Sequence, residues 1–333
     1  MVTVVVATPL EPELVERLRH VDPRLEVLFE PDLLPPARYP CDHAGDPSFR
    51  RTAEQERRFE ALLGRAEVLL GFPGEDPRQL AEALRSAPRL RFVQAMYAGA
   101  GQQVEMARLP RAELERIVWT SSSGVHATPL AEWSLLGILA LTRELPRLLA
   151  DQHERRWNRR PVEEVRGKTL LVVGLGAIGR EVARLGEALG MHVLSLTRTS
   201  GDLDELLPQA DAVVLTLPLT AETHGLLDRR RIGSMRRGSI LVNVGRGAVL
   251  DEEALVDALR ERRLLGAVLD VFVHEPLPPE SPLWELDNVI LSPHMAALSV
   301  HENERIVDLF ADNLRRYLAG EELRSRIRTD LFY

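Results

Sequence analysis

The chain has 333 residues, of which 45% are hydrophobic and 28% charged, and its formal net charge is −8. This length and composition indicate about two globular domains, each able to bury a core of its own. The acidic balance excludes bulk attraction to nucleic acid or to an anionic membrane, so we expect neither as a partner.

The cysteine content and the apolar segments favour a cytoplasmic protein. Cys41 is the single cysteine, so the chain forms neither an intramolecular disulfide nor a zinc site built from cysteines. No apolar run approaches the roughly 20 residues that span a bilayer. The apolar N-terminal run 1–6 lacks the basic segment and the cleavage site of a signal peptide, and we interpret it as a buried strand.

The first hundred residues alternate between strand-like and helix-like segments. β-branched and apolar runs predict the strands, and apolar residues at helical spacing predict the helices between them. The polar, proline-rich segment 31–51 predicts a long surface loop. This alternation is typical of a parallel sheet with helices on its faces. The predicted strands are 2–7, 25–29, 68–71 and 90–95, and the predicted helices are 11–20, 52–63 and 77–86.

The small residues 121–124 suggest a domain crossing. After them, residues 129–149 predict one long apolar helix, buried against its own domain and a second subunit. The alternation then resumes, and its six strands predict a doubly wound, Rossmann-type α/β sheet that binds a dinucleotide. These strands are 169–173, 192–196, 212–217, 240–244, 266–270 and 289–291, and the helices among them include 179–189 and 251–261.

The last predicted helix, 300–318, has no remaining sheet of its own. We therefore expect it to return to the first domain, which makes that domain discontinuous. The predicted domains are 1–124 together with 299–333, and 125–298 between them.

A glycine-rich turn, Gly-Leu-Gly-Ala-Ile-Gly, follows the strand 169–173. Gly174 permits the tight bend, Gly176 lets the backbone approach a pyrophosphate, and Gly179 allows the helix to pack closely on the strand. The helix N-terminus then offers N–H groups and a partial positive charge to the phosphates. The bare pattern is weakly specific, but its position between a strand and a helix predicts dinucleotide binding.

The end of the following strand bears on the choice of cofactor. An NAD site places an acidic residue about 20 residues after the glycines, to hold the ribose 2′-hydroxyl. Here the strand ends in Thr197, Arg198 and Thr199, with no carboxylate before Asp202. An arginine flanked by hydroxyls suits a 2′-phosphate. The alternative is a solvated loop arginine, so NADP(H) is favoured and NAD(H) remains possible.

Three charged or titratable residues, Arg246, Glu275 and His294, follow later predicted strands. Open α/β sheets bind ligands at the carboxyl ends of their strands, so these side chains can converge beside a nicotinamide. Reduction of a 2-keto acid needs these residue types. The arginine can hold the substrate carboxylate and polarise its carbonyl, the histidine can donate a proton as hydride arrives, and the carboxylate can orient the imidazole.

Five motifs resemble those of the D-isomer-specific 2-hydroxyacid dehydrogenases. Their order and spacing also agree with that family, and the resemblance extends over nearly the whole chain. The motifs are GLGAIGR at 174–180, LPLT at 217–220, VNVGRGAVLDEEAL at 242–255, DVFVHEPLP at 270–278 and SPHMAA at 292–297.

The resemblance implies a role for each residue of the site. Arg246 binds the substrate, Glu275 is the partner of the histidine, and His294 is the acid/base. Backbone N–H groups of Ala98 and Gly99 receive the substrate carboxylate, in a flavodoxin-like substrate domain into which the Rossmann-type domain is inserted. Asp270 meets the nicotinamide carboxamide, and the remaining cofactor contacts come from Ala177, Ile178, Leu217, Pro218, Val244, Gly245 and His294. The helix 129–149 resembles the family's dimer element, which predicts a homodimer through the cofactor domain.

Several activities compete within this resemblance. Formate dehydrogenases carry glutamine where Glu275 stands, so that activity is disfavoured. Only 39 residues follow His294, which leaves a phosphoglycerate dehydrogenase of the short, unregulated type as an alternative. Arg198 favours a reductase of glyoxylate, hydroxypyruvate or a similar small 2-keto acid. A non-catalytic dinucleotide sensor, like the corepressors that share this fold, is the alternative from another class. The histidines show no metal-ligand spacing, and we expect no metal.

Overall fold

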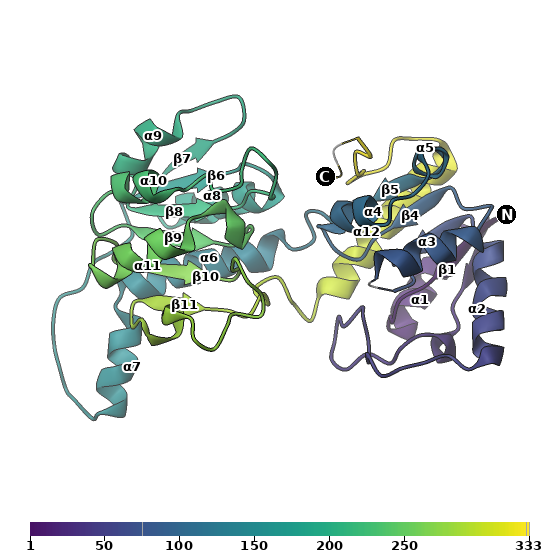
Figure 1. Ribbon diagram of the computed structural model, residues 1–333, viewed down its shortest axis with the longest axis horizontal. Helices are drawn as coiled ribbons and strands as arrows, with labels where there is room; N and C mark the ends of the chain where they lie inside the picture. Colours follow the sequence, from purple (N-terminus) through teal and green to yellow (C-terminus); the bar gives the residue numbers. More distant parts are fainter. Residues whose placement is uncertain (75, 331, 333) are drawn as a thin grey trace. The chain divides into compact units, whose positions relative to one another are not determined.

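The computed structural model describes residues 1–74, 76–330 and 332, and the chain divides into two compact units. Unit 1 consists of Met1–His126 together with Leu298–Tyr333, and unit 2 is the intervening segment Ala127–Ala297. Each unit is a layered α/β structure with one parallel sheet between helices (Figure 1).

The sheet of unit 1 has five parallel strands in the order β2-β1-β3-β4-β5, which is the flavodoxin order. Side chains alternate between the two faces of β1. Val5 therefore lies in one apolar core, whereas Val4 and Val6 lie in the other. The strands are β1 (Val2–Val6), β2 (Leu25–Leu28), β3 (Val68–Leu70), β4 (Phe92–Gln94) and β5 (Val118–Thr120).

Helices from both ends of the chain cover the sheet of unit 1. Helix α12 packs with α1 in the core that contains Val4, where the rings of Phe310 and Phe92 lie 5.8 Å apart between centroids. Helices α2 and α3 contribute to the core on the opposite face. Unit 1 is thus discontinuous in sequence. Its helices are α1 (Pro12–Arg19), α2 (Ala53–Arg65), α3 (Pro77–Arg85), α4 (Ala100–Met106), α5 (Arg111–Arg116) and α12 (Glu302–Ala319), with a 3-10 turn η1 (Pro31–Leu33).

The sequence does not predict strand β5 or helices α4 and α5. β5 has three residues and α5 has six, which is too short for a hydrophobic period to be recognised. β5 is held instead by parallel pairing with β4 and by Trp119, which is 1% exposed in the core. The position of β5 in the sheet is therefore determined by tertiary contacts.

The sheet of unit 2 has six parallel strands in the order β11-β10-β9-β8-β6-β7. The chain runs from β6 outward to β7 and then returns to β8 on the other side of β6. This reversal is the topological switch point at which doubly wound sheets bind dinucleotides. The strands are β6 (Thr169–Val173), β7 (His192–Leu196), β8 (Ala212–Leu215), β9 (Ile240–Asn243), β10 (Gly266–Leu269) and β11 (Val289–Leu291).

Two apolar cores lie on the two faces of this sheet. Helices α6 and α8 contribute to one core, and α10 and α11 contribute to the other. Helix α6 approaches β10 so closely that a Cβ on Gly137 would lie 2.5 Å from a methyl group of Val268. The helices are α6 (Ala127–Thr142), α7 (Leu145–His153), α8 (Ala177–Ala188), α9 (Leu203–Leu206), α10 (Arg229–Ser234) and α11 (Glu252–Arg260), and the 3-10 turns are η2 (Leu207–Gln209), η3 (Gly247–Val249) and η4 (Pro282–Glu285).

The prediction of one helix over residues 129–149 is wrong. The segment forms two helices, α6 and α7, which are separated at Glu144, whose φ is +53°. The physical reason is Pro146. A proline inside a helix lacks the N–H donor and clashes with the carbonyl four residues earlier, whereas it is accepted in a first turn. In the part of the chain that the structure describes, no helix has the length and apolarity to cross a membrane.

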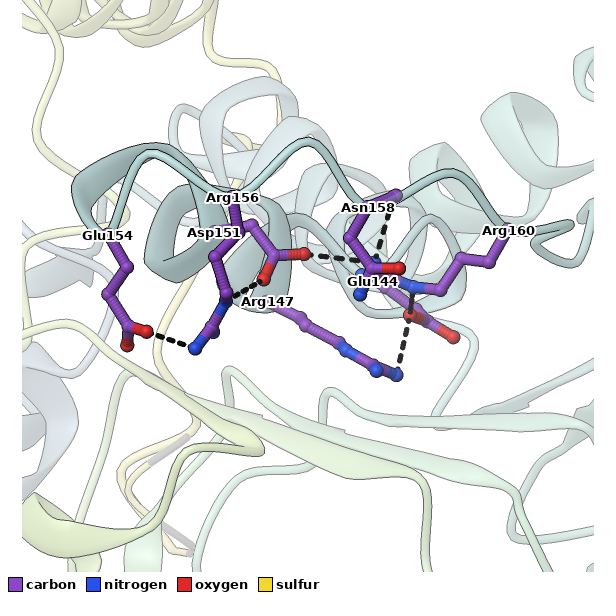
Figure 2. A network of polar contacts seen from close by, with 7 residues as sticks. All are labelled: Glu144, Arg147, Asp151, Glu154, Arg156, Asn158 and Arg160. Atoms are coloured by element: carbon purple, nitrogen blue, oxygen red, sulfur yellow. Dashed lines mark hydrogen bonds and ion pairs between the residues drawn. The ribbon is translucent and has the colours of Figure 1, made fainter.

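An ion-pair network folds the chain back onto α7 (Figure 2). The buried carboxylate of Asp151 accepts hydrogen bonds from Nε of Arg156 at 2.9 Å and from Nη1 of Arg160 at 3.0 Å. Arg160 also donates from Nε to Glu144 Oε2 at 2.6 Å, so one guanidinium joins both ends of α7. The guanidiniums of Arg160 and Arg156 hold the pKa of Asp151 below its usual range.

We expect Asp151→Asn to loosen the segment from residue 144 to residue 160. A carboxylate whose pKa is lowered by folding stabilises the folded form above its unfolded pKa of about 4, and this stabilisation is lost as the pH falls through its lower folded pKa. Amide hydrogen exchange, corrected for intrinsic rates, should show lower protection in the variant at pH 7 and a difference that shrinks below about pH 4. Asp287→Asn, which removes the exposed pair with Arg262, is the control. Equal protection of wild type and Asp151→Asn at pH 7 would contradict this account.

Candidate active site

The carboxyl ends of the six strands of unit 2 lie at one edge of the sheet, because all six strands are parallel (Figure 1). Each predicted site residue of unit 2 lies at or beyond such an end. The segments concerned follow β6, β7, β8, β9, β10 and β11, and they contain in turn the glycine turn, Arg198, Leu217 with Pro218, Arg246, Glu275 and His294.

The glycine turn has the geometry that a phosphate site needs. Gly174 has φ +102°, and a Cβ on Gly179 would lie 1.9 Å from the Gly174 carbonyl oxygen, so neither position accepts a side chain. Gly176 precedes the first turn of α8, and a Cβ built there meets no atom within 4 Å. The backbone at Gly176 therefore faces open space at a helix N-terminus. This arrangement fits the pyrophosphate of a dinucleotide.

The segment after β7 presents hydroxyl groups and one arginine. Thr197 Oγ1 lies 2.7 Å from Ser200 Oγ, and Arg198 extends into solvent with 68% of its side chain exposed. Nη2 of Arg198 donates to Oε2 of Glu222 at 2.6 Å. The sequence does not point to Glu222, because 24 residues separate it from Arg198.

The loop that carries Arg246 is shaped by Asn243, which is the last residue of β9 and fully buried. The Asn243 side chain accepts from the Gly245 N–H at 3.1 Å and donates to the Arg246 carbonyl oxygen at 3.0 Å. A Cβ on Gly247 would lie 2.0 Å from the backbone of Phe272. The Arg246 loop therefore contacts the loop after β10 backbone to backbone, and only glycine fits at that contact.

His294 and Glu275 form a hydrogen-bonded pair. Nδ1 of His294 lies 2.8 Å from Oε2 of Glu275, and Oε1 of the same carboxylate accepts from the Phe272 N–H at 3.0 Å. With Nδ1 engaged by a carboxylate, the imidazole presents Nε2 for proton transfer. The two side chains are 48% and 36% exposed, so a ligand can reach them.

Asp270 organises the loop that carries His294. Its backbone carbonyl accepts from the His294 N–H at 3.0 Å, and its carboxylate accepts from the N–H groups of Met295 at 2.9 Å and Ala296 at 3.0 Å. His294 itself has φ +53°, a backbone conformation that needs such support. The sequence interpretation misses this contact of Asp270 and the role of Asn243. The available signal is a polar residue at the end of an otherwise apolar strand.

The remaining predicted site residues are divided between the two units. Val244 and Gly245 share the loop of Arg246, and Pro218 accepts a hydrogen bond from Thr223 in the loop after β8 at 2.6 Å. Ala98 and Gly99 are exposed in unit 1, just before α4. Among residues 1–74, 76–330 and 332, no group of three His, Cys, Asp or Glu side chains could hold a metal ion.

A buried polar network fixes the segment that leads to Ala98 and Gly99. Gln94 donates to the Ser121 carbonyl at 2.9 Å and accepts from Asn313 at 2.9 Å. Ser122 donates to the Ala95 carbonyl at 2.7 Å. The side chains of Gln94, Ser122 and Asn313 have no exposed surface, and a buried polar group left unpaired costs about 1–3 kcal/mol. The network therefore ties the end of β4 to both β5 and α12.

Known proteins resemble this chain in sequence and in structure. The family model described as D-isomer specific 2-hydroxyacid dehydrogenase, NAD binding domain, matches residues 135–296. A glyoxylate reductase of Thermofilum pendens is 35% identical over 260 residues, which cover 72% of this chain and 76% of that protein.

Two solved structures resemble the whole chain. A D-isomer specific 2-hydroxyacid dehydrogenase family protein of Aeromonas salmonicida is 30% identical, with a TM-score of 0.77 and coverage of 99% of both chains. A D-isomer specific 2-hydroxyacid dehydrogenase of Xanthobacter autotrophicus Py2, solved in complex with NADPH and MES, is 26% identical, with a TM-score of 0.77 and the same coverage.

Proposed function

We propose that this chain, which belongs to the D-isomer specific 2-hydroxyacid dehydrogenase family, reduces a small 2-keto acid of the glyoxylate or hydroxypyruvate class to the corresponding 2-hydroxy acid, the D isomer where the product is chiral. Membership makes the protein an oxidoreductase that acts on CH–OH groups with a nicotinamide dinucleotide. The observation that carries the proposal is the 2.8 Å contact between His294 and Glu275 at the carboxyl edge of the unit 2 sheet. The identity with a glyoxylate reductase supports the substrate class.

The proposed proton donor is Nε2 of His294. A reduced nicotinamide, when bound, supplies the hydride that adds to the substrate carbonyl carbon. As the carbon–oxygen π pair moves onto the oxygen, protonated His294 gives it the Nε2 proton. Glu275 keeps the ring in position through Nδ1 and stabilises its positive charge before the transfer. In the reverse direction, neutral His294 accepts the hydroxyl proton.

The proposed substrate anchors are one arginine and two backbone amides. Arg246 would pair with the substrate carboxylate and polarise the carbonyl oxygen, since a guanidinium binds planar oxyanions in a bidentate fork. Its loop is held by Asn243 and by the close contact of Gly247 with Phe272. In unit 1, the N–H groups of Ala98 and Gly99 are the other proposed carboxylate ligands, which makes unit 1 the substrate domain.

The proposed cofactor is NADP(H) in preference to NAD(H). Arg198 and the hydroxyls of Thr197 and Thr199 support this proposal, because together they suit a 2′-phosphate. The proposed contacts to the rest of the cofactor are the backbone of Gly174–Gly179, with Leu217, Pro218, Val244, Gly245 and Asp270. A relative at 26% identity was solved in complex with NADPH.

The proposed assembly is a homodimer formed through unit 2. Helix α7 exposes three apolar side chains, Leu145, Leu148 and Leu149, to between 41% and 55%, and Trp157 beyond it is 92% exposed. A cluster of exposed apolar side chains is typical of an interface. We also propose a cytoplasmic protein without nucleic-acid or membrane partners, because its net charge is −8 and Cys41 is its single cysteine.

His294→Ala should lower kcat for glyoxylate reduction by about 10²–10⁴-fold, because it removes the proton donor. Cofactor affinity should stay within about threefold, since the glycine turn is untouched. Glu275→Gln keeps a hydrogen-bond acceptor but removes the charge, so we expect a smaller loss of kcat. Steady-state kinetics and cofactor titration measure both effects, with His192→Ala, an exposed residue of β7, as the control. Near-normal kcat in His294→Ala would refute the mechanism.

Arg198→Ala should weaken NADPH binding by about tenfold or more, the size of a lost charge-assisted contact to phosphate, and change NADH binding by less than about threefold. Titration of both cofactors by nicotinamide fluorescence measures this. If the variant binds NADPH as wild type does, Arg198 is not the 2′-phosphate ligand.

Sedimentation equilibrium should give twice the chain mass of 37.3 kDa. Replacing Leu148 and Leu149 together by aspartate should shift the protein towards monomer, because charges in an apolar interface are left without partners. A monomeric wild-type protein would contradict the proposed assembly.

A further inference from the structure

The ion pair between Arg198 and Glu222 joins the segments that follow β7 and β8. In the sheet order, β6 lies between those two strands, and β6 leads into the glycine turn. The pair therefore bridges from one side of the phosphate turn to the other. The pair includes Arg198, the proposed ligand of the cofactor 2′-phosphate.

The backbone around Glu222 is held by a hydrogen-bonded turn. Thr223 Oγ1 donates to the Pro218 carbonyl at 2.6 Å and accepts from the Thr220 N–H at 2.8 Å, and the His224 N–H donates to the Thr220 carbonyl at 2.9 Å. The Glu222 carboxylate thus extends from an ordered segment. Its side chain is 72% exposed and that of Arg198 is 68% exposed, so a ligand can reach both charges.

The Glu222 carboxylate is expected to interact differently with NADPH and with NADH. A 2′-phosphate carries between one and two negative charges at neutral pH, so it repels Glu222 and competes with it for the same guanidinium. A ribose 2′-hydroxyl is a donor, and a carboxylate accepts its hydrogen bond, as acidic residues do in NAD sites. Glu222 therefore disfavours the binding of NADPH and does not disfavour the binding of NADH.

We propose that Glu222 is a specificity-determining residue that competes with the 2′-phosphate for Arg198 and so narrows the preference for NADPH over NADH. This inference rests on the proposed role of Arg198 in the cofactor site. The ratio of the affinities for NADPH and NADH then depends on both side chains of the pair and not on Arg198 alone.

The test is Glu222→Gln, which keeps the size of the side chain and removes its charge. We expect the Kd for NADPH to fall by about threefold to tenfold, as expected for removing one charge a few ångströms from a phosphate in water. The Kd for NADH should stay within about twofold or rise. The gain for NADPH should shrink as salt is raised from 50 mM to 500 mM, because exposed charges are screened. The Kd values of 2′,5′-ADP and 5′-AMP, which differ only in the 2′-phosphate, test the same effect of Glu222 without turnover.

Asp257→Asn is the matched control, because Asp257 forms a pair with Arg229 between α10 and α11, at 2.7 Å, in which both side chains are also exposed. It changes the net charge by the same amount. The inference is overturned if Glu222→Gln leaves NADPH affinity unchanged or weakens it, if both cofactors tighten equally, or if Asp257→Asn has the same effect.

Arg198→Ala separates this inference from the proposed function. If that variant loses NADPH affinity while Glu222→Gln gains none, the inference about Glu222 fails and the 2′-phosphate role of Arg198 stands. If Arg198→Ala leaves NADPH affinity unchanged, the proposed role of Arg198 fails and the competition proposed for Glu222 fails with it.

Discussion

The candidate active site depends on the hydrogen bonds that Asp270 makes at the carboxyl end of β10. Its carbonyl and carboxylate oxygens together accept three backbone N–H groups from residues 294–296, and this fixes the loop that leaves the neighbouring strand β11. His294 can then hold a left-handed backbone conformation. This conformation costs about 1 kcal/mol or more for a residue other than glycine when nothing supports it. In that position its ring lies within hydrogen-bond distance of Glu275, at 2.8 Å.

Buried and exposed polar contacts serve different purposes in this molecule. Asp270, Asn243 and Gln94 are buried, and each is paired with backbone groups, so their contacts are costly to break and they hold loops in one geometry. The pair of Arg198 and Glu222 is exposed and screened by water, so a ligand can exchange one partner for another at low cost. The loops around Asp270 and Asn243 are thus held by buried contacts, whereas the pair of Arg198 and Glu222 is open to exchange with a ligand.

Local patterns were sufficient for the family, the two-sheet architecture and the principal chemistry. The family and the enzyme class predicted from the five motifs, and the fold class predicted with them from the alternation of strands and helices, are confirmed by the comparisons. Strands β6, β8, β9 and β10 were predictable because each is a short, mostly apolar run of buried residues, whereas β7 and β11 are partly exposed runs. β6, β7 and β11 were predicted with their observed bounds. Arg246, Glu275 and His294 could be proposed together because parallel strands end at one edge, although their roles remain proposals.

The amino-acid sequence by itself determined where the glycine turn lies and which residue types follow each strand of unit 2, because turns and buried strands depend on neighbours in the chain. The features that depend on long-range contacts were decided only by the tertiary structure. It placed the three-residue strand β5 beside β4, and brought Asp270 to residues 25 and 26 positions further along the chain. It also set Glu222 against Arg198 across β6. Such contacts leave no periodic trace in the sequence, since the partners meet only after the sheet has assembled.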